Sequence, residues 1–129
     1  MRILAIALVA CAFALPAAAA GPASIEPKAL GARIAWADQA LFVLDVRTPE
    51  EYAAGHLPGA VNIPHDQLAA RLGELSGARE RDIVVYCRTG RRSAEALGVL
   101  DKAGFKRLFH LKGDYTRWTE EKRPVIATQ

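Results

Sequence analysis

Residues 83–93 read Ile83-Val84-Val85-Tyr86-Cys87-Arg88-Thr89-Gly90-Arg91-Arg92-Ser93. The apolar run at 83–86 predicts a buried strand, and the pattern at 94–103 predicts the helix that follows the loop. Cys87 is therefore expected at a strand end, where loop N–H groups and a helix N-terminus converge. Such a nest of N–H groups stabilises anions, and hence a thiolate. The segment predicts a nucleophile held in an anion cradle.

The rest of the chain repeats this order of strand and helix. The run Leu41–Leu44 predicts a second strand buried on both faces, and it ends at Asp45. Further strands are expected at 60–63 and 107–111, and helices at 25–37, 49–54, 64–77 and 115–121, after a linker at 21–24. This alternation predicts an α/β domain, a parallel sheet with helices on both faces. Ligands bind outside the carboxyl ends of such strands, where Asp45 and Cys87 are expected.

The first 20 residues predict a secretory signal peptide. Met1-Arg2 precedes an apolar stretch at 3–15 and the run Ala17–Ala20, and we expect cleavage after Ala20. Two alternatives remain: an uncleaved anchor, or a lipoprotein box, Leu8-Val9-Ala10-Cys11, lipidated at Cys11. Without the leader Cys87 is the single cysteine, so no internal disulfide can form. A lone thiol in an oxidising compartment calls for a functional explanation.

Size and charge limit the possible functions. The 129 residues suffice for one domain, and the net charge of +3 is too small for nucleic-acid binding by bulk attraction. The positive charge is local instead, because Arg88, Arg91 and Arg92 lie within five residues, which favours a small-anion site beside the thiol. His65 and His110 cluster with no other ligand, so we expect no metal site.

Two long motifs resemble those of rhodanese-homology domains. The first runs from Leu44 to Tyr52 and continues from Gly55 to Pro64, and the second is the loop from Val84 to Ser93. Shorter matches are Gly104-Phe105 and Leu111-Lys112-Gly113. The resemblance covers residues 25–125. Together with the leader, it implies a single-domain, periplasmic member of the family.

The resemblance implies a thiosulfate sulfurtransferase, a rhodanese, that needs no cofactor. The Cys87 thiolate would take a sulfane sulfur from thiosulfate or a related anionic donor and become a persulfide. Cyanide or a thiol, including a protein thiol, would then accept that sulfur. The substrate-binding residues would be the rest of the loop, with Arg91 the preferred contact: Arg88, Thr89, Gly90, Arg91, Arg92 and Ser93. Backbone amides from Arg88 to Ser93 are expected to hold the sulfur.

Asp45 and Arg47 are expected to support the site. We interpret Asp45 as fixing loops through hydrogen bonds to backbone rather than as a general base, because an ionised thiol needs none. Arg47 is expected to pair with Glu51, four residues on. Ser93 fits a helix N-cap better than a hydroxyl aimed at the sulfur.

Three further residues carry expectations about packing and the pocket. Trp36 and Trp118 are expected to pack in the core or at its edge. Asp114 stands where the family often has a second glycine. A carboxylate at the pocket rim would weaken anion binding or pair with a loop arginine.

Three other functions stay open. A phosphatase or arsenate reductase on this fold needs an arginine six positions after the cysteine, and Ser93 stands there. A non-catalytic docking module usually lacks the cysteine. A persulfide carrier would differ from thiosulfate turnover mainly in its acceptor.

Overall fold

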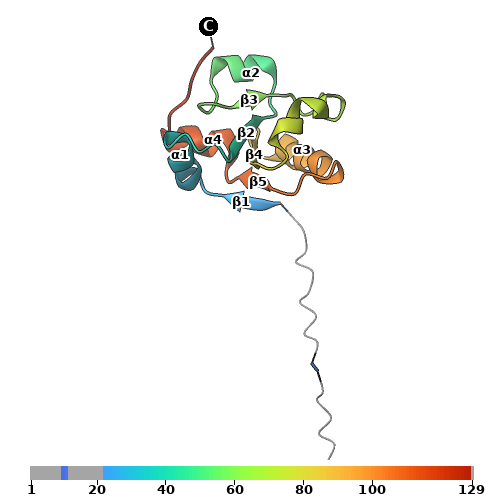
Figure 1. Ribbon diagram of the computed structural model, residues 1–129. Coiled ribbons are helices and arrows are strands. Elements are labelled where there is room, and N and C mark those ends of the chain that lie inside the picture. The colour runs from blue at the N-terminus through green and yellow to red at the C-terminus, as the bar shows by residue number, and fades with distance from the viewer. Residues whose placement is uncertain (1–9, 12–21, 129) are drawn as a thin grey trace, which may run out of the picture.

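Five parallel strands organise the computed structural model, which describes residues 10–11 and 22–128. The strands are β1 (Ala23–Ile25), β2 (Leu41–Asp45), β3 (Val61–Asn62), β4 (Asp82–Tyr86) and β5 (Leu108–Leu111), in the order β1-β5-β4-β2-β3 (Figure 1). Apart from Ala10 and the exposed Cys11, the predicted signal peptide lies outside the described residues.

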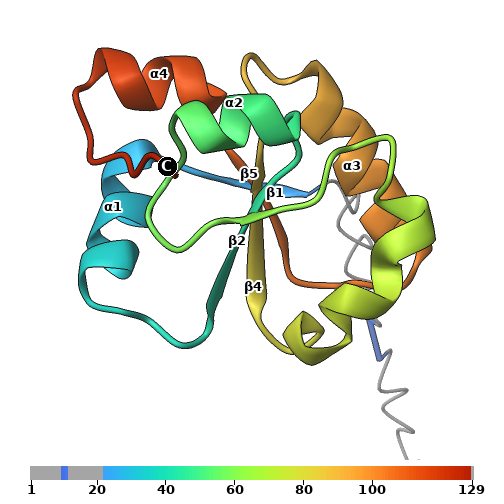
Figure 2. The same ribbon diagram turned by 90° about the horizontal axis from the view of Figure 1, so that it is seen from above.

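Helices cover both faces of the sheet, as Figure 2 shows. On one face lie α1 (Pro27–Ala35) and α4 (Asp114–Glu120); on the other lie α3 (Arg91–Lys102) and the 3₁₀ helix η1 (Ala69–Ala78). Each face has its own apolar core. Leu30 and Trp118 pack with Val84 on one side, and Leu75 and Leu100 pack with the other face. The predicted α/β fold with a flanked parallel sheet is confirmed.

The register of the two central strands places the candidate site. β2 pairs with β4 over five positions, from Leu41 with Asp82 to Asp45 with Tyr86. The carboxyl ends of both strands therefore lie side by side, with Cys87 directly after β4. The short helix α2 (Pro49–Ala54) follows β2 at the same end. Thr48 caps it, with Glu51 completing a capping box.

Four expectations about the elements are wrong. Residues 23–25 form the edge strand β1 rather than a linker, and α1 begins at Pro27, because β1 pairs with β5. The segment at 64–77 forms η1, with a non-helical Arg71 and two glycines that weaken an α-helix. α3 begins at Arg91, three residues earlier than expected, because the loop closes at Gly90. Trp36 is 82% exposed, whereas Trp118 is buried as expected.

None of the helices in the described part of the chain has both the length and the apolar character of a membrane span.

Candidate active site

Cys87 lies at the carboxyl end of the central strand β4, and its side chain is directed into a tight loop. The Gly90 N–H donates a hydrogen bond to Sγ at 3.0 Å. Gly90 has φ of 124°, a conformation that favours glycine and turns its amide back toward the sulfur. Within the described residues, Gly90 is the single backbone donor to Sγ, so the expected set of amides from Arg88 to Ser93 is narrower than predicted.

The thiol is buried, with only 1% of Cys87 exposed. The neighbouring Arg88 and Thr89 are exposed. Arg88 also lines a cleft of about 490 Å³ whose other walls come from α2 and α4. Arg88 is the one residue of the Cys87 loop that lines this cleft, and Cys87 itself does not line it.

The three loop arginines differ in their partners. Arg88 and Arg91 are exposed and form no ion pair with any residue that the structure describes. Arg92 instead binds Glu51 of α2 through both guanidinium nitrogens, at 2.7 and 3.1 Å. The hydrogen bonds that Arg92 donates to Glu51 raise the pKa of Arg92, and its electrostatic interaction with Cys87 adds to the effect. Two arginines therefore remain free for an anion.

Glu51 is a residue that the sequence analysis assigned to another partner. The expected ion pair between Arg47 and Glu51 is wrong, because Glu51 reaches across to Arg92 and back to Thr48. Arg92 lowers the pKa of Glu51 to about 2. The Thr48-x-x-Glu51 capping pattern signalled the contact with Thr48; no sequence pattern signalled the contact with Arg92.

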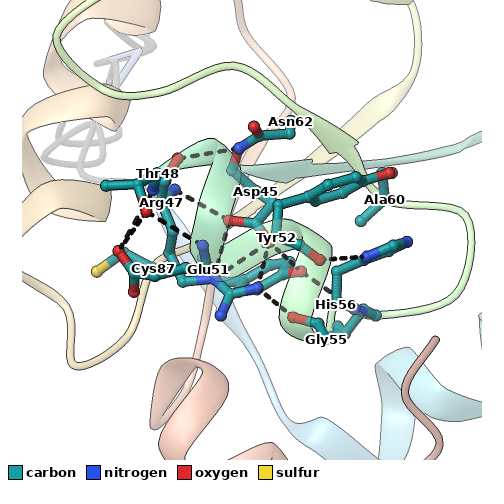
Figure 3. A network of polar contacts seen from close by, with 12 residues as sticks. Asp45, Arg47, Thr48, Glu51, Tyr52, Gly55, His56, Ala60, Asn62 and Cys87 are labelled. Atoms are coloured by element: carbon teal, nitrogen blue, oxygen red, sulfur yellow. Dashed lines mark hydrogen bonds and ion pairs between the residues drawn. The ribbon is translucent and has the colours of Figure 1, made fainter. Parts of the chain in front are cut away.

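Arg47 is buried in the segment between β2 and α2 and binds the last residue of β2 and the residue that follows α2. It donates to Asp45 at 2.6–3.1 Å and to the Gly55 carbonyl at 2.7 Å (Figure 3). Its guanidinium carbon lies 4.0 Å from the centre of the Tyr115 ring. Burial acts to lower the pKa of Arg47, but Asp45 outweighs burial and raises it. The buried guanidinium thus joins β2, α2 and α4.

Asp45 has partners in the backbone as well as in side chains. It accepts hydrogen bonds from the Arg47 N–H at 2.9 Å and from the Tyr86 hydroxyl at 2.7 Å. Every one of these contacts orders backbone or a buried neighbour. The arrangement is that of a structural carboxylate, as interpreted from the sequence.

A second polar cluster lies directly against the thiol, and the sequence analysis missed it. Asp114 is 1% exposed, and its Oδ1 accepts the Cys87 N–H at 3.0 Å and the Ser93 hydroxyl at 3.0 Å. The same oxygen lies 3.6 Å from Sγ. Oδ2 lies 2.9 Å from Nε2 of His110. The expected places of Asp114 at the pocket rim and of His110 outside any cluster are therefore wrong.

The backbone explains this placement. Gly113 and Asp114 both have positive φ, 78° and 53°, so the chain turns sharply at the start of α4 and brings Asp114 beneath the loop. Ser93 is not the N-cap, which is Gly90; it is the third residue of α3. Its hydroxyl oxygen lies 2.9 Å from the Gly90 carbonyl and 3.5 Å from Sγ, so the less favoured expectation, a hydroxyl directed at the sulfur, is the one that the structure shows. No sequence pattern signalled the cluster, because His110 lies in β5 and Asp114 begins α4.

The site offers a nucleophile and no multidentate metal centre. Within residues 10–11 and 22–128, no three His, Cys, Asp or Glu side chains are arranged to hold a metal ion. Cys87 has an amide donor and the N-terminus of α3 beside it, both of which favour negative charge on sulfur or on an anion. The arrangement suits covalent chemistry at sulfur.

Comparisons with known proteins agree on one family. The sequence profile of the Rhodanese-like domain matches residues 26–121. The chain is 34% identical over 105 residues to a sulfurtransferase of Allochromatium vinosum, across 81% of this chain and 95% of that protein. It is 37% identical over 94 residues to a Mycobacterium tuberculosis protein named as a probable adenylyltransferase/sulfurtransferase, covering 71% of this chain but 24% of that longer protein. A rhodanese-related protein of Thermoplasma volcanium has a similar solved structure, with TM-score 0.70 and 33% identity, over 81% of this chain and 97% of that one.

Proposed function

Because the chain belongs to the rhodanese-like domain family, whose relatives include named sulfurtransferases, we propose that it transfers sulfane sulfur through a persulfide on Cys87. The observation that carries the proposal is the contact of the Gly90 amide with Sγ, 3.0 Å, at the carboxyl end of β4. A backbone donor in that position stabilises a thiolate and then the sulfur of a persulfide.

The proposed donor is thiosulfate or a related small anion. The Cys87 thiolate attacks the terminal sulfur, the S–S bond of the donor breaks, and sulfite leaves with the bonding electron pair. The product is Cys87–S–S⁻. An acceptor, cyanide or a thiolate, then attacks the outer sulfur and releases the Cys87 thiolate. Arg88 and Arg91, both free of ion pairs in the described part of the chain, offset the repulsion between thiolate and dianion.

The burial of Cys87 adds a requirement to this reaction. At 1% exposure the sulfur is closed to a donor, so the groups that cover it must move before attack. Burial also favours a second candidate, a non-catalytic binding module in which the thiol only packs. The two candidates differ in whether Cys87 reacts at all.

Mass spectrometry of the intact protein separates them. After treatment with thiosulfate and removal of excess donor, we expect a gain of about 32 Da, one sulfur, which peptide mapping places on Cys87. Cys87→Ser should show no gain and form no thiocyanate when cyanide is added. A wild-type protein that folds, reacts with iodoacetamide at Cys87 and gains no sulfur from any sulfane donor would support the binding module.

We further propose that the chain is exported to the periplasm, on the strength of the pattern in residues 1–20. Expression of the full chain in a bacterium followed by fractionation tests this. The exported species should begin at Gly21. A lipid-modified species beginning at Cys11 would support the lipoprotein alternative.

A further inference from the structure

The carboxylate of Asp114 is placed to take part in the chemistry of Cys87. It lies 3.6 Å from Sγ in a position where the thiol can donate its hydrogen to Oδ1, and the residue is 1% exposed. Two negative charges at that separation, away from water, strongly disfavour each other. Cys87 and Asp114 therefore cannot both be ionised without cost.

The geometry points to Asp114 as the proton acceptor for the Cys87 thiol, so that the pair shares one proton. This inference rests on the proposed sulfur transfer. When the thiol is intact, Asp114 is ionised; when the thiolate forms, Asp114 is neutral. The total charge of the pair stays at −1, and the acid proton on Oδ1 faces the sulfur.

In the first half-reaction, each bond that forms is matched by a bond that breaks. The Sγ–H bond breaks and an Oδ1–H bond forms on Asp114. Sγ then bonds to the terminal sulfur of the donor, the donor S–S bond breaks, and sulfite leaves with the electron pair. In the second half-reaction the acceptor removes the outer sulfur, and the released Cys87 thiolate can recover its proton from Asp114.

Ser93 can adapt to both proton positions. Its single hydroxyl hydrogen has two acceptors within reach, Asp114 Oδ1 at 3.0 Å and the Gly90 carbonyl at 2.9 Å. With Asp114 ionised, the hydroxyl donates to Oδ1. With Asp114 protonated, it donates to the Gly90 carbonyl and leaves Oδ1–H free to bond to sulfur.

His110 is the positioning residue of this cluster. Its Nε2 binds Oδ2 at 2.9 Å, which leaves Oδ1 directed at the thiol. His110 also lines a pocket of about 410 Å³ with Ser24, Asp101 and the loop residue Gly90, so the cluster adjoins this pocket. Among the described residues, the other charged side chain close to Cys87 is Arg92, and Glu51 binds it.

The pH dependence of alkylation by iodoacetamide tests the inference without any sulfur donor. In the wild-type protein the fraction of Cys87 thiolate paired with neutral Asp114 does not change with pH while the pair holds one proton. We expect the rate constant to level off below about neutral pH and to vary less than about threefold down to about pH 5. In Asp114→Asn it should keep falling about tenfold per pH unit.

Asparagine is a suitable replacement because it has nearly the same shape and tolerates the positive φ of 53° at this position. Asp114→Gly, which also accepts that φ, is a second variant with the same expectation. Asp101→Asn removes an exposed carboxylate from the wall of the His110 pocket without touching Cys87, and should keep the wild-type plateau. His110→Ala should lower the alkylation rate constant at the plateau, because Asp114 Oδ2 loses its partner. His110→Gln keeps an N–H donor and should restore that rate constant.

A wild-type rate that falls tenfold per pH unit down to about pH 5, as in Asp114→Asn, overturns the role of Asp114. The same holds if the plateau persists in both variants at position 114. These results are independent of sulfur transfer. A protein that gains sulfur on Cys87 but shows no plateau in the alkylation rate has the proposed function without proton sharing between Cys87 and Asp114. A protein that shows the plateau but gains no sulfur shares the proton and lacks the proposed function.

Discussion

At the scale of single residues, the site depends on a buried network of hydrogen bonds that joins Tyr86, Asp45 and Arg47. The Tyr86 hydroxyl accepts the Leu57 N–H at 3.1 Å and donates to Asp45 at 2.7 Å. Burial, then the charge of Asp45, raises the pKa of Tyr86, so the hydroxyl stays a donor throughout the physiological range. Asp45 in turn holds Arg47, and these contacts fix the loop after β2.

Tyr86→Phe should therefore destabilise the protein by about 1–3 kcal/mol, because it leaves the buried Leu57 N–H without an acceptor and deprives Asp45 of a donor. Urea unfolding measures the loss. The matched control is Tyr52→Phe, which removes a half-buried hydroxyl bound to the Ala60 carbonyl and should cost about 0.5–1.5 kcal/mol. Equal losses of unfolding free energy in the two variants would show that the burial of the Tyr86 hydroxyl does not increase its contribution to stability.

The same scale shows what the sequence could and could not predict. Cys87 was predictable because its neighbours are local: an apolar strand before it, and glycine and arginines after it. Asp114 was not, because its position depends on two consecutive positive φ angles that bring a residue 27 positions away under the thiol. The ion pair of Arg92 with Glu51 could not be predicted for a similar reason, since the two residues lie 41 positions apart.

At the scale of elements, the pair of Glu51 and Arg92 joins α2 to α3 across the carboxyl ends of the strands. Arg92 lowers the pKa of Glu51 from 4.5 to about 2. A carboxyl whose pKa is lowered by folding stabilises the protein above its unfolded pKa and loses that contribution as the pH falls through its folded value. The contribution should therefore disappear between about pH 4.5 and about pH 2.

Glu51→Gln should lower the free energy of unfolding by about 1 kcal/mol at neutral pH, because both side chains are about a quarter exposed and water screens the pair. The difference from wild type should shrink toward zero near pH 2. Urea unfolding at a series of pH values measures it. Glu50→Gln, a change on the same helix with no ion pair among the described residues, should show almost no difference. A gap between wild type and Glu51→Gln that does not depend on pH would argue against the pair.

The turn into α4 places Asp114, and it depends on Gly113. This residue has φ of 78°, and a Cβ there would collide with the side chain of Arg117. Gly113→Ala should destabilise the protein by about 1–3 kcal/mol through this strain. Gly73→Ala in η1, where a Cβ meets nothing within 4 Å, should be neutral or slightly stabilising. Thermal unfolding compares the two, and a neutral Gly113→Ala would contradict the strained turn.

Elements were predictable in proportion to their length and regularity. β2 and β4, each five residues of buried, mostly apolar sequence, were placed within one residue. β1 has three residues with two exposed, and no periodicity can be detected in so short a segment. η1 has the apolar spacing of a helix, but its glycines lead to a tighter, irregular winding that spacing does not reveal.

At the scale of the whole molecule, the strand order places the site between the two apolar cores. β4, which ends at Tyr86 directly before Cys87, lies between β5 and β2. β5 contributes His110, and β2 contributes Asp45. The groups in contact with Cys87 itself come from elsewhere: Ser93 lies in the first turn of α3 and Asp114 begins α4. Because α3 and α4 pack on opposite faces of the sheet, the sheet holds both residues at its carboxyl edge (Figure 2).

The edge strand β1 links this architecture to the predicted leader. Ser24 lies level with His110, and the Lys112 N–H donates to the Ile25 carbonyl at 3.0 Å, so β1 protects the edge of the strand that carries His110. Cleavage after Ala20 would leave β1 intact. A chain of residues 21–129 should therefore be fully stable, whereas a chain of residues 26–129 should unfold at a lower urea concentration, because β5 loses its edge partner. Equal midpoints for the two chains would show that β1 contributes nothing to the fold.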